Sequence, residues 1–248
     1  MRKFLNFLFF GVFIISLAGC ATLQQGRQPT AHVDNNAGAQ ALPPYSGPKA
    51  RMAVADFEVK AAKASNEIGS GLREMLITAL VNSNRFSVVE RQALEAVMQE
   101  QELASSGAAQ QGTGPKRGNI KTADLVITAA VTEFEPQASG GSAGVGGGGG
   151  VASGILGGLL GAALNKAHMA LDIRVIDAST SEVLSATRVQ GQASDISGGF
   201  LAGFFGSWGM GAGLSVYSNT PMEKAIRICI IEAVRYLSQT ISASYYKY

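Results

Sequence analysis

An uncharged run of twenty-two residues constrains this chain more than any other feature. It reads SGGFLAGFFGSWGMGAGLSVYS, from Ser197 to Ser218, and carries Phe, Trp and Met along its length. A membrane-spanning helix needs about 20 predominantly apolar residues, whereas five glycines interrupt the apolar part, Phe200–Val216. A soluble core helix would show a polar face in helical register, and this run has none. Both helical interpretations therefore fit poorly.

The run instead alternates with a period of two. Even positions carry mostly bulky apolar residues, and odd positions carry mostly small or polar ones. If 205–207 is a three-residue loop, the alternation continues across it and leaves two strands, 195–204 and 208–217. Strands of membrane β-barrels have about 9–11 residues and alternate in this way. We therefore predict a transmembrane β-hairpin within 194–218. Its predicted lipid-facing residues are Phe200, Phe204, Trp208, Met210, Leu214 and Val216.

A second glycine-rich block occupies 137–167 and leaves two alternatives open. One is another membrane hairpin, with its turn at Gly146–Gly150. The other is a glycine-zipper helix, in which small residues recur every four positions. These small residues are Gly150, Gly154, Gly158 and Ala162. We favour the hairpin, because helix interiors tolerate glycine poorly and a lone membrane hairpin would be unusual.

Two hairpins per chain require an oligomer. They supply four strands, whereas a closed barrel needs about eight, and open sheet edges are not tolerated in lipid. The chain must then form a homo-oligomeric ring in which neighbouring copies pair edge to edge and contact outer-membrane lipid. Small residues on the inner face imply a wide, water-filled pore.

The N-terminus has the pattern of a bacterial lipoprotein. A basic start precedes the apolar segment Phe4–Ser16, which is too short to span a membrane. The lipobox-like motif LAGC then ends at Cys20. We predict a signal peptide over 1–19 and acylation of Cys20, which includes palmitate and gives a stable anchor. Ala21 after the cysteine fits sorting to the outer membrane of a Gram-negative bacterium, with the main domain in the periplasm.

Composition argues against catalysis and against nucleic-acid binding. Once Cys20 is acylated, Cys229 is the one cysteine left, and His32 and His168 are the only histidines. We expect no catalytic residues, no metal site, no cofactor and no disulfide, and hence no enzyme. Cys229 lies on the apolar side of a helical pattern and is predicted to be buried. The net charge is +2 without a basic block, so nucleic acid is not an expected partner.

The remaining sequence predicts an α+β, or mixed α/β, periplasmic domain with the order β-α-β-α-β-β-β-α. Strands are expected over 51–57, 86–90, 124–134, 168–178 and 183–192, and helices over 67–82, over 91–103 and from Pro221. The predicted organisation is a signal peptide (1–19), a lipidated tether (20–49), the first part of the periplasmic domain (50–136), the glycine-rich hairpin (137–167), a periplasmic β-hairpin (168–193), the second membrane hairpin (194–218) and a C-terminal helix and tail (219–248).

Several of these segments together resemble the CsgG family of outer-membrane lipoproteins, which secrete curli subunits. The matching stretches are LAGC, RMAVADF, LREMLITALVNSNRFSVVERQALEAVMQEQ, ADLVITAAVTEFE, ALDIRVIDASTSEVLSA and the junction VYSNTP. The resemblance implies a nine-fold ring in which two hairpins per subunit build one barrel. It also implies secretion, without ATP, of unfolded curli-like amyloid or adhesin subunits, with periplasmic accessory proteins as further partners.

One segment departs from the family pattern. Channel proteins of the family narrow the pore with an aromatic loop after the first strand, but here 59–69 reads VKAAKASNEIG and has no aromatic residue. A polar constriction built from Lys63, Ser65, Asn66 and Glu67 is one interpretation, and a merely solvated loop is the other. Two further functions stay open: a structural anchor for holdfast-like adhesive material, and a non-pore lipoprotein that regulates a periplasmic cell-wall synthase.

Overall fold

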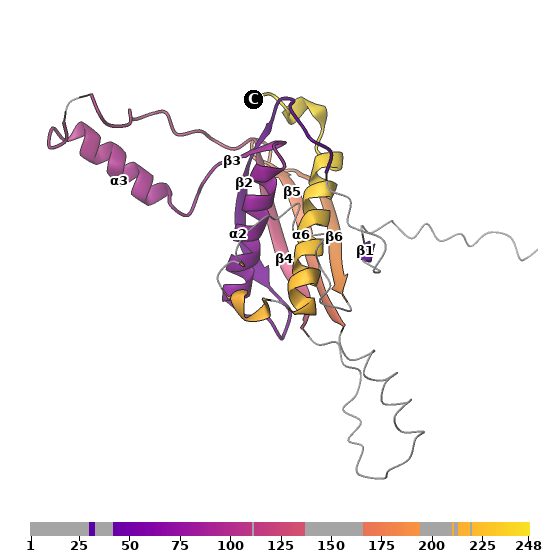
Figure 1. Cartoon of the computed structure of the whole chain (residues 1–248). Coiled ribbons are helices and arrows are strands. Elements are labelled where there is room, and N and C mark those ends of the chain that lie inside the picture. The colour runs from indigo at the N-terminus through magenta and orange to yellow at the C-terminus, as the bar shows by residue number, and fades with distance from the viewer. Residues whose placement is uncertain are drawn as a thin grey trace, which may run out of the picture.

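The computed structural model describes residues 42–110, 112–136, 166–193, 213–218 and 220–248, together with Met210 and the backbone of 30–32. These residues form a mixed α/β domain built on one six-stranded sheet, with strand order β1-β6-β5-β4-β2-β3. Helices α2 and α6 pack side by side on one face of the sheet (Figure 1). The elements are β1 (Thr30–His32), β2 (Ala50–Val59), α2 (Asn66–Asn82), β3 (Phe86–Val88), α3 (Leu94–Ser105), β4 (Leu125–Glu135), β5 (Ala167–Asp177), β6 (Val183–Ala193), the 3-10 helix η2 (Ser215–Tyr217), α6 (Pro221–Thr240) and the 3-10 helix η3 (Ala243–Tyr245).

The predicted order of strands and helices is confirmed, and β1 is added at the β6 edge. Strand β2 lies parallel to β3 and β4, whereas β4, β5 and β6 are antiparallel, so the sheet is mixed. Helix α3 begins at Leu94 rather than at 91. The reason is local, because the Glu90 carboxylate accepts the backbone N–H groups of 91–93 before the helix starts.

The core lies between the sheet and the two helices. Helix α6 starts in the way its sequence indicates, since Thr220 caps it and Pro221 occupies its first turn. Cys229 is fully buried with its apolar neighbours on this helix, which confirms the expected role as a small core residue. Burial raises the pKa of the Cys229 thiol far above its usual range, so the thiolate needed for reactivity does not form.

The C-terminal tail closes the upper end of the sheet (Figure 1). Tyr246 forms an isolated β-bridge with Ala50 at the start of β2, and its ring lies 6.1 Å from that of Phe86. The Arg51 guanidinium lies 3.5 Å from the ring centroid of Tyr248, a cation–π contact. The tyrosines at the end of the chain therefore have a structural role that the sequence pattern did not reveal.

Tyr245 makes the tail sensitive to acid. Its hydroxyl donates to the Asp177 carboxylate at 2.6 Å, and this bond, with the N–H groups of Thr180 and Ser179, lowers the pKa of Asp177 to about 2. A carboxyl whose pKa is lower in the folded than in the unfolded state contributes stability above its unfolded pKa. That contribution disappears as the pH falls towards 2.

We expect Tyr245→Phe to be less stable than wild type near neutral pH, and the difference to shrink between pH 4 and pH 2. Urea unfolding followed by circular dichroism across this range measures it. Tyr45→Phe is the matched control, because the Tyr45 hydroxyl donates to the Pro48 carbonyl, which does not titrate. A Tyr245→Phe deficit that stays constant with pH, like that of the control, contradicts the Asp177 linkage.

Within the described part of the chain, none of the helices combines the length and apolar character that crossing a membrane requires.

Candidate functional site

Both glycine-rich insertions are attached at the same end of the sheet. Glu135, the last residue of β4, pairs with His168 near the start of β5, and Ala167 pairs with Ala193, the last residue of β6. This end, the lower one in Figure 1, is called the insertion end below. The chain enters 137–165 from β4, returns into β5, and leaves again from the end of β6, so the attachment points are adjacent.

Lys63, the first residue of the predicted constriction, lies at the insertion end. The loop that follows β2 stays on the sheet, because Lys60 and Ala61 donate their N–H groups to the Val131 carbonyl at 2.9 and 3.0 Å. This arrangement carries the Lys63 ammonium to the Glu135 carboxylate, with which it forms an exposed ion pair. The loop and the root of the first insertion are therefore in contact.

The other three constriction residues lie at the start of α2. Ser65 is the N-cap residue, and Asn66 and Glu67 begin the first turn, with all three side chains exposed. Glu67 also borders the chain returning from the second insertion. A Cβ atom added to Gly213 would lie 2.8 Å from the Glu67 Cβ. The structure thus brings the four predicted residues together beside the roots of both insertions.

The predicted second hairpin needs a correction at its C-terminal end. The strand proposed over 208–217 is wrong for 213–217, which forms a turn and helix η2. Gly213 has φ +74°, which breaks an extended strand, and Leu214 is fully buried in the core. Met210 also packs against the core, so neither Met210 nor Leu214 faces lipid, whereas Val216 is 75% exposed on η2.

The physical reason for this correction is the burial of Leu214 in the core, next to the start of α6. The Tyr217 ring also contacts that of Phe134 edge to face at 5.3 Å. Burial of these apolar side chains stabilises the turn. The other lipid-facing candidates, Phe200, Phe204 and Trp208, and the lipidation candidate Cys20 lie outside the described residues, as does most of 137–167.

A charged cluster on the sheet face opposite the helices was not predicted. Arg188 donates to the two Asp172 oxygens at 2.7 and 3.3 Å and to Glu133 at 3.1 Å, and Glu133 also pairs with His168. The Asp172 carboxylate raises the pKa of Arg188. The signal in the sequence was the charged residues at alternate positions of β5. This half-buried cluster gives the sheet face opposite the helices a polar surface near the insertion end.

Among the residues that the structure describes, no three His, Cys, Asp or Glu side chains lie close enough together to hold a metal ion. The insertion end presents exposed polar side chains and chain segments that enter and leave the sheet.

Comparison with known proteins gives relatives over nearly the whole chain. An inferred lipoprotein of Neisseria meningitidis serogroup B is 26% identical over 234 residues, which are 92% of this chain and 90% of the relative. Among solved structures, a hypothetical protein of Chlamydia trachomatis matches with TM-score 0.44 and 14% identity, covering 79% of this chain and 99% of that one. The PelC dodecamer of Paraburkholderia phytofirmans matches with TM-score 0.32 and 12% identity, covering 75% and 94%.

The model of one family matches most of the sequence. It describes the curli production assembly/transport component CsgG, and it spans residues 38–247. The match covers every strand of the domain except β1, both helices that cover the sheet, and both insertions. The chain therefore belongs to the CsgG family.

Proposed function

We propose that this chain is an outer-membrane lipoprotein that forms an oligomeric secretion pore. Cys20 is acylated, the described domain lies in the periplasm, and the two insertions enter the membrane. The observation that carries the proposal is that both insertions and the loop containing Lys63 lie at one end of a single sheet. A ring of such domains directs every hairpin to the same side, as a shared barrel requires.

The correction at Gly213 shortens the second hairpin but does not eliminate it. With the loop at 205–207, the first arm, 195–204, keeps ten residues, within the range of a membrane strand, while the second arm is cut to 208–212. The first arm keeps Phe200 on its apolar face. The second arm ends where Gly213 turns the chain back onto α2. The proposed hairpin therefore spans 194–212, with Met210 at the end of the second arm turned towards the domain core rather than towards lipid.

The proposed constriction is polar and weakly selective. Lys63 is neutralised by Glu135, which leaves the exposed Ser65, Asn66 and Glu67 to line the ring where barrel and periplasmic domain meet. Such a ring has no aromatic side chains to close around a chain. It suits unfolded curli-like amyloid or adhesin subunits, moved without ATP and delivered by periplasmic accessory proteins.

Conductance in a planar bilayer tests this proposal. We expect the detergent-extracted, lipidated chain to migrate as an oligomer that heat dissociates, and to give large, stable conductance steps. A ring of nine subunits is the expected stoichiometry, which mass photometry measures. A chain that stays monomeric and gives no conductance contradicts the pore.

Two observations favour other functions; the bilayer measurement separates the first from the pore, and a deletion strain separates the second. The folding of 213–218 onto the domain favours a non-pore lipoprotein that regulates a periplasmic cell-wall synthase. Such a protein would remain monomeric in the bilayer experiment. The lack of aromatic residues in 59–69 favours a structural anchor for adhesive material. An anchor would form the conducting ring, but a strain lacking it would secrete the adhesive subunits and shed them.

A further inference from the structure

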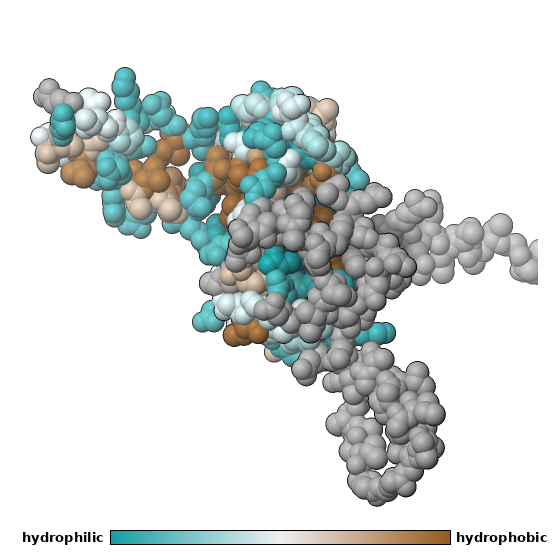
Figure 2. All heavy atoms as spheres, in the orientation of Figure 1, coloured by the Kyte–Doolittle hydropathy of each residue, from teal (hydrophilic) through white to brown (hydrophobic). Residues whose placement is uncertain are grey.

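Helix α3 and the return segment 112–123, together called the arm, project away from the body of the domain (Figure 1). Gln101 is the one buried residue within α3, and the helix has no extensive contact with another described helix or strand. Apolar side chains are nevertheless exposed along it. Met98 is 56% exposed, Leu103 49% and Val97 43%. Figure 2 shows brown, hydrophobic spheres on the projecting part.

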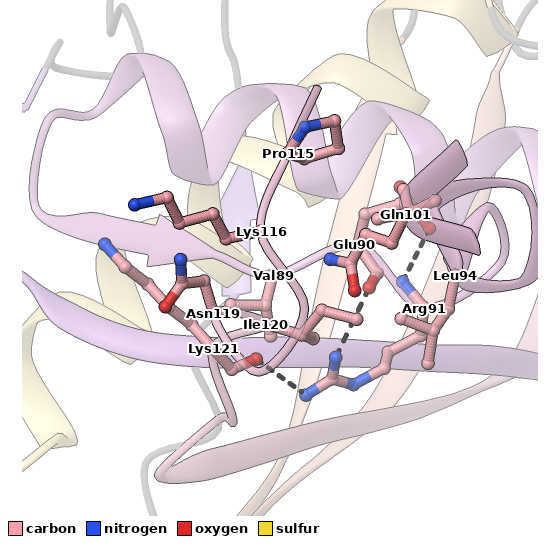
Figure 3. Close-up of a pocket in the computed structure, with 11 residues that line it drawn as sticks. Val89, Glu90, Arg91, Leu94, Gln101, Pro115, Lys116, Asn119, Ile120 and Lys121 are labelled. Atoms are coloured by element: carbon pink, nitrogen blue, oxygen red, sulfur yellow. Dashed lines mark hydrogen bonds between the residues drawn. The ribbon is translucent and has the colours of Figure 1, made fainter. Parts of the chain in front are cut away.

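The arm is fixed at its root. The Glu90 carboxylate accepts the N–H groups of Arg91, Gln92 and Ala93 at 2.7, 2.6 and 3.4 Å. The Arg91 guanidinium donates to the Lys121 carbonyl at 3.5 Å, which joins the outgoing and returning segments of the arm (Figure 3). These bonds set the direction of the arm.

The root is also tied to the core of the domain. The buried Arg73 donates to the Val54 carbonyl at 3.2 Å, and its guanidinium lies 3.9 Å from Glu90. The side chain of Gln92 donates to Asp56 at 3.0 Å. A projecting helix that is fastened in this way points its apolar side chains in a defined direction, which is a property of a docking element rather than of a loose loop.

The charge on α3 indicates what it docks against. The helix LEAVMQEQELAS carries Glu95, Glu100 and Glu102 and no basic residue. Helical spacing places Glu95 and Glu102 beside Met98. Glu102 pairs with Arg117 of the return segment at 3.7 Å, so Glu95 provides the negative border of the apolar patch. A surface complementary to this helix is apolar with a positive border.

The opposite edge of the sheet carries such a surface. Among the described strands, β1 pairs only with the last part of β6, so Val183–Val189 has no strand on its outer side. Val183 is 51% exposed, and Leu184 is also exposed. Arg174 pairs in register with Ala186 on this edge, is exposed, and forms no ion pair with any described residue. Unpaired edge strands with apolar side chains are natural docking sites.

The two surfaces lie at the same level along the sheet but at opposite edges. The arm returns into β4 at Leu125, which pairs with Asp177, while the neighbouring Ile176 pairs with Val183 of β6. The arm leaves beside β3, at the far edge of the strand order from β6. An arm therefore cannot reach the β6 edge of its own sheet, but it faces that edge in a copy placed alongside.

We propose that the arm docks on the β6 edge of a neighbouring copy of this chain. Met98 and Val97 meet Val183 and Leu184, and the Glu95 carboxylate of α3 faces Arg174. This contact joins two different surfaces, so it is head-to-tail, and repetition by a constant rotation closes a ring. The inference rests on the proposed function, because it supplies the contact that holds the periplasmic domains of the ring together.

Disulfide trapping in the full lipidated chain tests the contact. We expect a chain carrying both Met98→Cys and Leu184→Cys to form, on oxidation, a ladder of covalent oligomers up to the full ring. Either single variant stays monomeric, and a mixture of the two gives covalent dimers only. A double variant that gives no ladder overturns the proposal, and so does a dimer from Met98→Cys alone.

Substitution tests it independently. Met98→Lys should lower the amount of heat-labile oligomer at least about tenfold at matched concentration. Gln99→Lys, on the neighbouring polar side of the same helix, should leave it unchanged. Conductance distinguishes failure of this proposal from failure of the pore. A conducting ring without a ladder overturns the arm contact alone, whereas a ladder without conductance overturns the pore alone. If neither a ladder nor conductance is observed, both proposals are overturned.

Discussion

Gly191→Val should unfold the domain or destabilise it by about 3 kcal/mol or more. Gly191 lies in β6 directly under α6, and the helix backbone approaches it closely. A Cβ atom built on Gly191 would overlap the Ala225 carbonyl oxygen and lie 2.9 Å from the Cys229 nitrogen. Both contacts are to backbone, which cannot move aside as a flexible side chain can. The valine must therefore push α6 away from the sheet and open the core that the helix fills.

Urea unfolding of the full chain in detergent, followed by circular dichroism, measures this loss. Gln190→Val is the matched control, because it puts the same side chain on the same strand but on the sheet face away from the helices. We expect the control to stay within about 0.5 kcal/mol of wild type. Equal stability of the two variants would show that α6 does not press on Gly191.

The regular part of the fold could be predicted because its signals are local. Thr220, Pro221 and an apolar stripe predict helix α6. Strict alternation from Met169 to Val175 predicts β5. The turn between β5 and β6 follows from the polar residues 179–182. In each case the pattern of apolar and polar residues lies within one helix, strand or turn, so the sequence alone predicts that element.

The errors and omissions arise where contacts between residues far apart in the sequence determine the local structure. The sequence does alternate across 208–217, but Leu214 is buried in the core by contacts that the alternation does not show, and η2 forms in place of the strand end. The sequence does not reveal the role of the tail, because Asp177, the partner of Tyr245, lies 68 residues away along the chain. The placement of Lys63 beside Glu135 likewise depends on sheet order rather than on spacing.

Phe200→Lys should abolish assembly of the proposed barrel. In the proposed hairpin, Phe200 lies on the apolar face, near the middle of the first arm. A lysine on the lipid face at the bilayer midplane costs roughly 2–4 kcal/mol. The substitution recurs in every subunit, so the cost accumulates around the ring. We expect no heat-labile oligomer and no conductance, while the chain remains anchored through Cys20 and its periplasmic domain stays folded.

Gly199→Lys is the control, because parity places this neighbouring residue on the inner face of the same arm. There the lysine faces water, so the ring should assemble and conduct, with a shift towards anion selectivity. In both variants the periplasmic domain should unfold at the same urea concentration as in wild type, since the described domain does not include either residue. Equal loss of assembly in the two variants would contradict the alternation on which the hairpin is based. Equal tolerance would place 194–212 outside the membrane and leave the non-pore regulator as the better account of the fold.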